Sequence, residues 1–235
     1  MTDLHTHILP GMDDGAQSVE ESIAMLREQA RQGVNTVALT PHFYRGKERP
    51  SMFLARRAEA WQKLQDALAA LPETERESLP KLILGAEVAY APGMWEWPEL
   101  ADLCYENTKV LLLELPIGQW NEEMFRQIYN LMSHTGITPM LAHVERYFHN
   151  RDFGRLFELQ LPMQVSAAAL LHIFGRKRAA ALLMEQEGIL ISDCHRMKFR
   201  EPNMEKALRW LEKKEGRRAV KFCIANTDRP LNGGI

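Results

Sequence analysis

The sequence lacks an excess of charge of either sign. Its 29 basic and 31 acidic residues leave a formal net charge of -2 when the 8 histidines are counted as neutral. Nucleic-acid-binding proteins usually carry a clearly basic face, so this balance argues against a nucleic-acid partner. The sequence also lacks an apolar run long enough to cross a bilayer, and we expect no membrane insertion.

Cysteine is scarce. The 235 residues contain Cys104, Cys194 and Cys223, an odd and widely spaced set. Such a set fits a reducing compartment better than a disulfide framework. The first residues also lack the basic start and apolar run of a secretory signal. We therefore expect a cytoplasmic protein, and with no linker or low-complexity segment we expect one domain over residues 1–235.

Short apolar segments alternate with amphipathic segments along the chain. We expect a helix that begins after Ser18 and ends before Gly33, and a loop at 72–80. Repeated alternation of strands and helices favours an α/β fold with a parallel sheet, either wound open or closed into a barrel. The strands are expected at 2–5, 34–40, 81–86, 109–115, 138–143, 163–166, 189–192 and 220–225, and further helices at 51–71, 121–134, 153–159, within 168–187 and at 203–215.

The start of the chain carries the strongest chemical signal. In the run Asp3-Leu4-His5-Thr6-His7, two histidines lie two residues apart at the end of an expected strand. Strand side chains alternate between faces, so both imidazoles can reach a single metal ion. Carboxylates follow at Asp13 and Asp14. Imidazole and carboxylate ligands suit zinc, manganese or iron, and they indicate a metal-dependent hydrolase.

Further potential ligands recur where the expected strands end. In a closed barrel the carboxyl ends of all strands meet at one mouth, so residues far apart in the sequence would converge there. A buried glutamate within an apolar run such as 111–115 needs a neutralising partner, which divalent cations would supply. The whole set indicates a metal site far better than any single member does. Its members are His5, His7, His42, Glu87, Glu114, His143, Asp193 and His195.

Other conspicuous residues are interpreted as structural. A lone histidine near an apolar segment is more often a hydrogen-bonded core residue than a ligand, and we place His134, His149 and His172 in that group. Trp95 and Trp97 could line a substrate groove or pack within a loop, and packing is the favoured interpretation.

Several stretches match one known family, in order, along nearly the whole chain. On these stretches the chain resembles the bacterial manganese-dependent tyrosine phosphatases of the polymerase and histidinol phosphatase (PHP) superfamily. Val144 is a departure, because the family usually has proline there. The matching stretches are His5-Thr6-His7-Ile8-Leu9-Pro10-Gly11-Met12-Asp13-Asp14-Gly15, Thr40-Pro41-His42-Phe43, Gly85-Ala86-Glu87, Glu114-Leu115-Pro116, His143-Val144-Glu145-Arg146-Tyr147 and Ser192-Asp193-Cys194-His195.

The resemblance implies a distorted β/α barrel of seven strands that holds three divalent metal ions. Manganese is the implied metal, although this ligand set would also accept iron, zinc or cobalt. The implied substrate is a phosphotyrosine protein, typically the tail of a membrane-associated tyrosine kinase that controls capsule or exopolysaccharide synthesis. Members of this family self-associate, so the resemblance implies a homo-oligomer. It does not define the number of subunits.

The resemblance also assigns roles to individual residues. Arg146 and Arg200 would hold phosphate oxygens, because the planar guanidinium matches phosphate geometry. Asp14 would also assist proton transfer. Metal-activated water would attack phosphorus in line, without a covalent enzyme intermediate. The implied metal ligands are His5, His7, Asp14, His42, Glu87, Glu114, His143, Asp193 and His195.

A cysteine mechanism is the first alternative. Cys194 and Arg200 have the Cys-x5-Arg spacing of the cysteine-dependent tyrosine phosphatases, in which a thiolate attacks phosphorus. No glycine lies between them, although a loop that cradles phosphate favours small, permissive residues. Strand alternation would also turn Cys194 away from a site shared by Asp193 and His195.

Two further alternatives concern the substrate and the activity itself. Other members of the superfamily hydrolyse small phosphate esters such as histidinol phosphate, or trim nucleic-acid ends. The neutral charge balance argues against a polynucleotide. A barrel that binds a partner without catalysis is disfavoured, because every expected ligand position holds a competent side chain.

Overall fold

The computed structural model describes residues 1–232, and the last three residues of the expected single domain lie outside this range. Nine strands in the described residues form three sheets with orders β1-β2-β4, β3-β5-β6-β7 and β8-β9. Every neighbouring pair is parallel, as the alternation of strands and helices predicts. The strands are β1 (Thr2–Thr6), β2 (Thr36–Leu39), β3 (His42–Phe43), β4 (Lys81–Leu84), β5 (Glu87–Ala89), β6 (Val110–Glu114), β7 (Thr138–Leu141), β8 (Gln164–Ser166) and β9 (Ile189–Ile191).

Backbone contacts connect the three sheets at their edges. Isolated parallel bridges join Thr6 to Cys194 and Leu141 to Met163. Only residues 40–41 separate β2 from β3, and only residues 85–86 separate β4 from β5. The parallel α/β class is thus confirmed, whereas three separate sheets do not by themselves establish a closed ring of seven strands.

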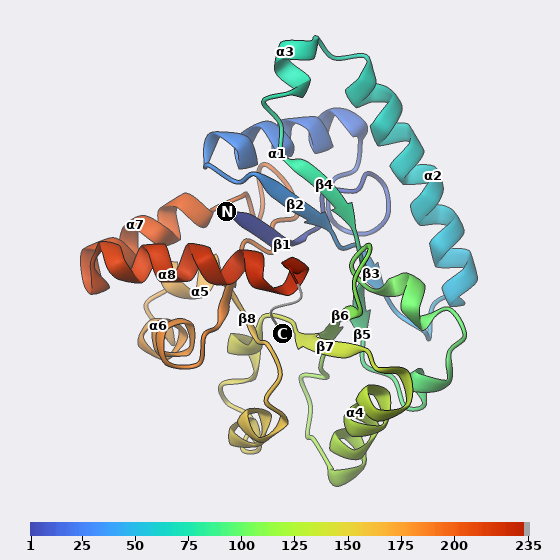
Figure 1. The fold of residues 1–235 in the computed structure, drawn as a ribbon, viewed down its shortest axis with the longest axis vertical. Helices are drawn as coiled ribbons and strands as arrows, with labels where there is room; N and C mark the ends of the chain where they lie inside the picture. The colour runs from blue at the N-terminus through green and yellow to red at the C-terminus, as the bar shows by residue number, and fades with distance from the viewer. Residues whose placement is uncertain (233–235) are drawn as a thin grey trace.

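Helices surround the strands on the outside of the molecule (Figure 1). In residues 1–232, none of them combines the length and the apolar character that a membrane span requires. The α-helices are α1 (Val19–Arg31), α2 (Pro50–Ala69), α3 (Glu73–Arg76), α4 (Glu122–Thr135), α5 (Ala167–Leu171), α6 (Arg176–Glu185), α7 (Met204–Glu215) and α8 (Arg217–Asp228), and the 3-10 helices are η1 (Met94–Glu96), η2 (Leu100–Leu103), η3 (Val144–Tyr147), η4 (Phe153–Leu159) and η5 (Arg229–Asn232).

Helix α1 begins and ends at the expected residues. The Ser18 hydroxyl accepts a hydrogen bond from the backbone N–H of Glu21 at 3.3 Å, as an N-cap residue does. Gly33 follows the helix with a φ of +81°, a left-handed conformation that glycine adopts without steric cost. Capping residues therefore fix where the loop before α1 stops, and that loop carries part of the site.

The prediction of a strand at 220–225 is wrong, because these residues lie inside α8. Alternating apolar residues in 220–224 suggested a strand, but the buried residues Ala219, Cys223 and Asn226 recur at helical spacing. Helix α8 packs against β1 and β9, and the Thr227 hydroxyl accepts the N–H of Thr2 at 3.0 Å. The helix therefore lies at the amino end of β1.

Two smaller segments also differ from expectation. Residues 72–80, expected as a loop, contain the short helix α3. The helix expected at 153–159 has the expected bounds but is the 3-10 helix η4. Neither difference moves a predicted ligand.

Buried apolar side chains form two clusters. The larger cluster packs strands against the surrounding helices and includes Leu26 of α1, Phe53 of α2 and Leu113 of β6. The smaller cluster takes residues from β1, β2, β4, β6, β7 and β9, among them Leu4, Leu112 and Ile191. Side chains from these six strands therefore pack together in one shared interior cluster.

We expect Leu113→Ala to lower the free energy of unfolding by about 3 kcal/mol, because truncation of a fully buried leucine leaves a cavity. Ile117→Ala removes a side chain that is 75% exposed and should change stability by less than about 0.5 kcal/mol. Equilibrium unfolding in urea measures both. Equal losses in the two variants would contradict this description of the core.

Candidate metal centre

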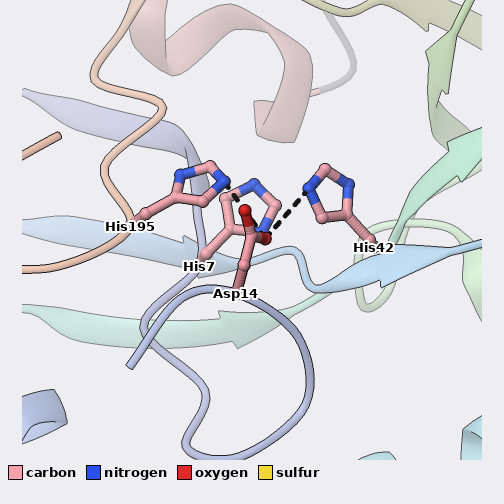
Figure 2. A group of neighbouring side chains, drawn as sticks. All are labelled: His7, Asp14, His42 and His195. Carbon is pink, nitrogen blue, oxygen red and sulfur yellow. Dashed lines mark ion pairs between the residues drawn. The ribbon is translucent and has the colours of Figure 1, made fainter. Parts of the chain in front are cut away.

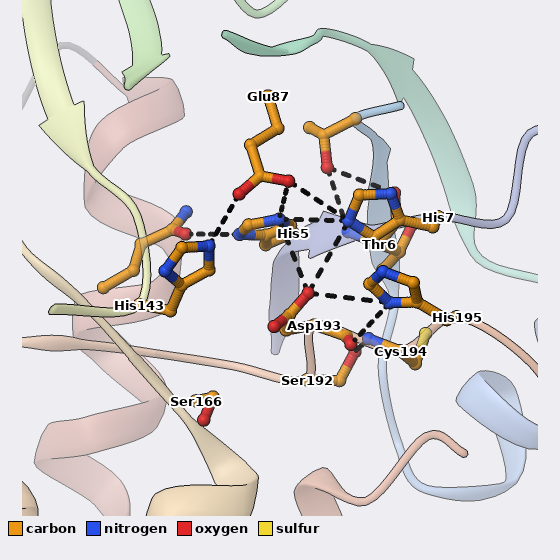
Figure 3. Close-up of polar contacts among 12 residues, drawn as sticks. His5, Thr6, His7, Glu87, His143, Ser166, Ser192, Asp193, Cys194 and His195 are labelled. Carbon is orange, nitrogen blue, oxygen red and sulfur yellow. Dashed lines mark hydrogen bonds and ion pairs between the residues drawn. The ribbon is translucent and has the colours of Figure 1, made fainter. Parts of the chain in front are cut away.

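The structure brings all nine predicted ligands together where strands end or, for β3 and β5, begin. Figure 3 shows His5, His7, Glu87, His143, Asp193 and His195 among them. Parallel strands end at one side of a sheet, so the loops after them share one mouth. His5 and His7 belong to β1 and the loop after it, which also carries Asp14; His42 begins β3, Glu87 begins β5, Glu114 ends β6, His143 follows β7, and Asp193 and His195 follow β9.

Glu87 lies at the middle of the cluster and is only 1% exposed. Its carboxylate oxygens lie 2.6 Å from His143 Nε2 and 2.7 Å from His42 Nδ1. They also lie 3.2 Å from His5 Nε2 and 3.4 Å from His7 Nε2. Burial disfavours the charged carboxylate, but the imidazoles of His5, His143 and His42 outweigh it and hold the pKa of Glu87 well below its usual range.

Asp193 faces His5 and His7 from the side opposite Glu87 (Figure 3). Its Oδ1 atom lies 3.6 Å from His5 Nε2, 3.6 Å from His7 Nε2 and 3.7 Å from His195 Nδ1. Burial alone would raise the pKa of Asp193, because it disfavours the charged carboxylate. The nearby histidines, His5 above all, outweigh burial and hold the pKa of Asp193 below its usual range. Two buried anions therefore enclose His5 and His7.

Asp14 lies at the mouth of the cluster. Its Oδ1 atom is 3.5 Å from His42 Nε2 and 3.5 Å from His195 Nε2, so the carboxylate lies between the two rings (Figure 2). The Asp14 side chain is 69% exposed, unlike the carboxylates of Glu87 and Asp193. It is thus the carboxylate of the cluster with the freest access to solvent.

The spacing of these atoms fits bound cations. Two atoms that each lie about 2.0–2.2 Å from one ion are separated by about 3–4 Å, beyond the hydrogen-bond distance of about 2.9 Å. The Nε2 atoms of His5 and His7 are 3.3 Å apart, and several histidine–carboxylate pairs are separated by a similar distance. Asp193 Oδ1 is also buried without a hydrogen-bond partner among the described residues.

Three groups of side chains within residues 1–232 could each hold a cation. Within each group, one ligand atom per residue lies within 4.8 Å of every other. Glu87 belongs to two groups and has two carboxylate oxygens, so it can bridge two cations. The groups are His7 with Asp14, His42 and His195; His5 with His7 and Glu87; and His42 with Glu87 and Glu114.

Two residues support the predicted ligands in a way that the sequence did not indicate; Asp13 was expected only as a nearby carboxylate, and Gln164 was not singled out. Asp13 Oδ2 lies 2.7 Å from His7 Nδ1 and accepts the backbone N–H of His42 at 2.8 Å. Burial opposes the charge, but the contact with His7 lowers the pKa of Asp13 to about 2. Gln164 Oε1 lies 2.9 Å from His5 Nδ1. Such partners orient a ligating imidazole and leave its other nitrogen for the metal.

Three residues of the site have a left-handed backbone. The φ angles are 29° for His143, 52° for Asp193 and 58° for Arg200, although none of them is glycine. Such conformations cost roughly 1–3 kcal/mol each and tend to cluster at functional sites. The surrounding fold therefore holds these side chains in orientations that the local sequence disfavours.

Arg146 and Arg200 lie beside the cluster, where the sequence predicts them. Arg146 Nη2 donates to Asp193 Oδ2 at 2.8 Å, and Arg200 Nη2 donates to the same oxygen. Both side chains line a cavity of about 650 Å³ together with Asp193. A guanidinium has five N–H donors, so each arginine has donors left for a ligand in the cavity.

The cysteine alternative does not fit this geometry. Cys194 is fully buried and faces away from the ligands, with Gln29 Nε2 3.5 Å from its sulfur. Burial raises the pKa of its thiol, which keeps the sulfur protonated and unreactive. The direction expected from strand alternation is therefore confirmed.

The residues interpreted as structural lie outside the cluster, but the expectation of core histidines is wrong, because His134, His149 and His172 are all exposed. The rings of Trp95 and His134 stack at 4.6 Å, and Trp95 donates to Gln127 at 3.1 Å, as the packing interpretation predicts. His149 and His172 do not reach the ligands, but they line the same cavity as Arg146 and Arg200.

Comparison with known proteins agrees with the geometry. The model of the family "Capsular polysaccharide synthesis, CpsB/CapC" matches residues 1–232. The chain belongs to this family. Among its relatives, tyrosine-protein phosphatase YwqE of Bacillus subtilis (strain 168) is 33% identical over 229 residues, which cover 92% of this chain and 85% of YwqE. Tyrosine-protein phosphatase CpsB of Streptococcus pneumoniae is 28% identical over 251 residues, which cover 98% of this chain and 98% of CpsB.

Solved structures extend the agreement to three dimensions. One crystal structure from a study of YwqE and CpsB, described as unique metal-dependent tyrosine phosphatases, superposes with a TM-score of 0.80 at 28% identity and covers 100% of this chain and 96% of that chain. A lactonase from Listeria monocytogenes superposes with a TM-score of 0.55 at 12% identity, covering 97% and 92% of the two chains, and shows a shared fold alone. The family resemblance read from the sequence is confirmed.

We expect Gly15→Ala to weaken manganese binding by about 10- to 100-fold, the range for loss of a residue that orients a ligand. A Cβ atom at Gly15 would lie 2.0 Å from the backbone oxygen of His7 and 2.5 Å from its Cβ, so His7 must move. Calorimetric titration of the metal-free protein with manganese measures the change.

Gly46→Ala is the matched control, because no atom lies within 4 Å of a Cβ at that position. It should bind manganese like the wild type. Wild-type affinity in Gly15→Ala would contradict the assignment of His7 as a ligand whose position depends on this loop.

Proposed function

We propose that this protein is a metal-dependent phosphatase that hydrolyses phosphotyrosine in proteins. The observation that carries the proposal is the convergence of five imidazoles and four carboxylates, Glu87 among them, with two arginines at the edge. The relatives named as tyrosine-protein phosphatases support the choice of substrate.

The residues of the site suit hydrolysis of an aryl phosphate. Divalent cations, when bound, would neutralise the phosphate dianion and acidify a water molecule. Arg146 and Arg200 would hold phosphate oxygens through the donors that Asp193 leaves free. Asp14 would exchange a proton with solvent at the mouth. The tyrosyl oxygen needs little protonation to leave, because its conjugate acid has a pKa of about 10.

We propose that the site holds three cations and that manganese is the native metal. The three groups of potential ligands support the number, and Glu87 would contribute ligand atoms to two of them. The proposed ligands are His5, His7, Asp14, His42, Glu87, Glu114, His143, Asp193 and His195. Iron, zinc or cobalt would also find suitable nitrogen and oxygen donors here.

The biological setting follows from the family. We propose that the substrate is the phosphorylated tail of a tyrosine kinase in capsule or exopolysaccharide synthesis, and that a homo-oligomer acts on it. We place the protein in the cytoplasm, where its three buried, unpaired cysteines would stay reduced.

We also propose that the chain is one domain built as a distorted seven-stranded barrel. In this description β2 with β3, and β4 with β5, each count as one interrupted strand. The bridges Thr6 to Cys194 and Leu141 to Met163, together with the shared interior cluster, support closure of the ring.

We expect exhaustive chelation to abolish hydrolysis of a phosphotyrosine peptide and manganese to restore it. Cys194→Ser should keep near-wild-type turnover, because the sulfur is buried away from the ligands. Phosphate release from the peptide measures both. Full activity after chelation, or complete loss in Cys194→Ser with an intact fold, would overturn the metal mechanism.

We expect Arg200→Ala to reduce kcat/KM for a phosphotyrosine peptide by about 10²- to 10³-fold, the usual cost of one donor to developing negative charge. Arg196→Ala is the control, because Arg196 lies in the same loop but pairs with Glu21. It should stay within a few-fold of the wild type. If Arg200→Ala retained wild-type activity, its role on the phosphate would be wrong.

A further inference from the structure

The cavity beside the metal centre extends beyond what the phosphate needs. Its volume of about 650 Å³ is typical of pockets that bind a small ligand. Arg146, Asp193 and Arg200 form the wall next to the ligand cluster. The rest of the cavity is lined largely by apolar groups, with Phe148 following η3, Ala168 and Ala169 on α5, and Phe174 before α6.

This cavity has three arginines in its wall, and one of them lacks an anionic partner. Arg178 donates to the backbone oxygen of Phe148 at 2.7 Å, and its guanidinium carbon lies 4.5 Å and 4.4 Å from the ring centroids of Phe148 and Phe153. Within residues 1–232 it forms no ion pair with a carboxylate, whereas Arg146 and Arg200 both pair with Asp193.

The other carboxylate of the wall is already occupied. Glu145 accepts hydrogen bonds from the backbone N–H and the hydroxyl of Ser166. The hydrogen bond to Phe148 and the contacts with two aromatic rings restrict the Arg178 guanidinium, so less conformational entropy is lost when it binds an anion. The cavity therefore presents an ordered positive charge that is free to bind a carboxylate.

The rim of the cavity carries exposed apolar side chains. Phe174, which lines the cavity, is 94% exposed, and Phe199, in the loop between His195 and Arg200, is 71% exposed. Large apolar side chains gathered on an exposed surface mark sites of contact with another protein. A peptide chain could therefore lie along this rim while one side chain enters the cavity.

We propose that this cavity binds the ring of phosphotyrosine and that Arg178 binds an acidic side chain next to it in the substrate. The inference rests on the proposed function. With the phosphate on Arg146 and Arg200, the aromatic ring would pack against the apolar wall. A carboxylate beside the phosphotyrosine would complement the unpaired charge of Arg178. The enzyme would thus prefer phosphotyrosine sites with acidic neighbours.

The test compares two peptides that differ only in the residues flanking phosphotyrosine, glutamate in one and glutamine in the other. For the wild type at low salt, we expect kcat/KM to be about 2- to 5-fold higher for the glutamate peptide, as befits one partly exposed ion pair. R178Q should abolish this preference and R178K should keep part of it. High salt should reduce the preference in the wild type.

K177Q is the matched control, because Lys177 neighbours Arg178 on α6 but does not line the cavity. It should keep the preference, whereas an equal loss in K177Q would indicate long-range charge and overturn the inference. A preference that survives in R178Q, or equal losses on both peptides, would overturn it too. If the wild type cleaves both peptides equally, this inference alone fails; if it cleaves neither, the proposed function fails with it.

Discussion

The structure depends on how the charge of Glu87 is balanced. This buried carboxylate touches four imidazoles, and Asp193 faces two of the same rings. Burial and the nearby His7 lower the pKa of His195 to about 3, while Glu87 and Asp193, despite burial, raise that of His5. Not every ring therefore carries a proton. The two buried anions need positive charge, and cations bound to neutral imidazoles would supply it.

The fold meets this constraint through interruptions in the strands. Strands β2 and β4 stop, and β3 and β5 then begin with His42 and Glu87, which pair in register. The close contact of Gly15 with His7 brings Asp13 against the His7 ring. Left-handed backbone at His143 and Asp193 places two further predicted ligands beside Glu87 and His5. Irregular backbone is thus concentrated where the ligands converge, while apolar packing of strands and helices holds it in place.

Much of this arrangement could be predicted from the sequence. Parallel strands carry their chemistry at their carboxyl ends, so Glu114 and His143 could be placed near His5 without coordinates. The support given by Gln164 could not, because it depends on a tertiary contact with His5. The same holds for Arg178, whose position depends on Phe148 and Phe153. The helix at 217–228 was missed because alternating apolar residues in a short segment fit a strand and a helix equally well.

The most direct test of the account is anomalous X-ray diffraction at the manganese absorption edge, on crystals of the manganese-loaded protein. Three anomalous peaks within the cluster, with the Glu87 carboxylate bridging two of them, are the predicted result. The absence of any peak between Glu87 and the imidazoles of His5, His7 and His42, in crystals that hold manganese elsewhere, would contradict the account.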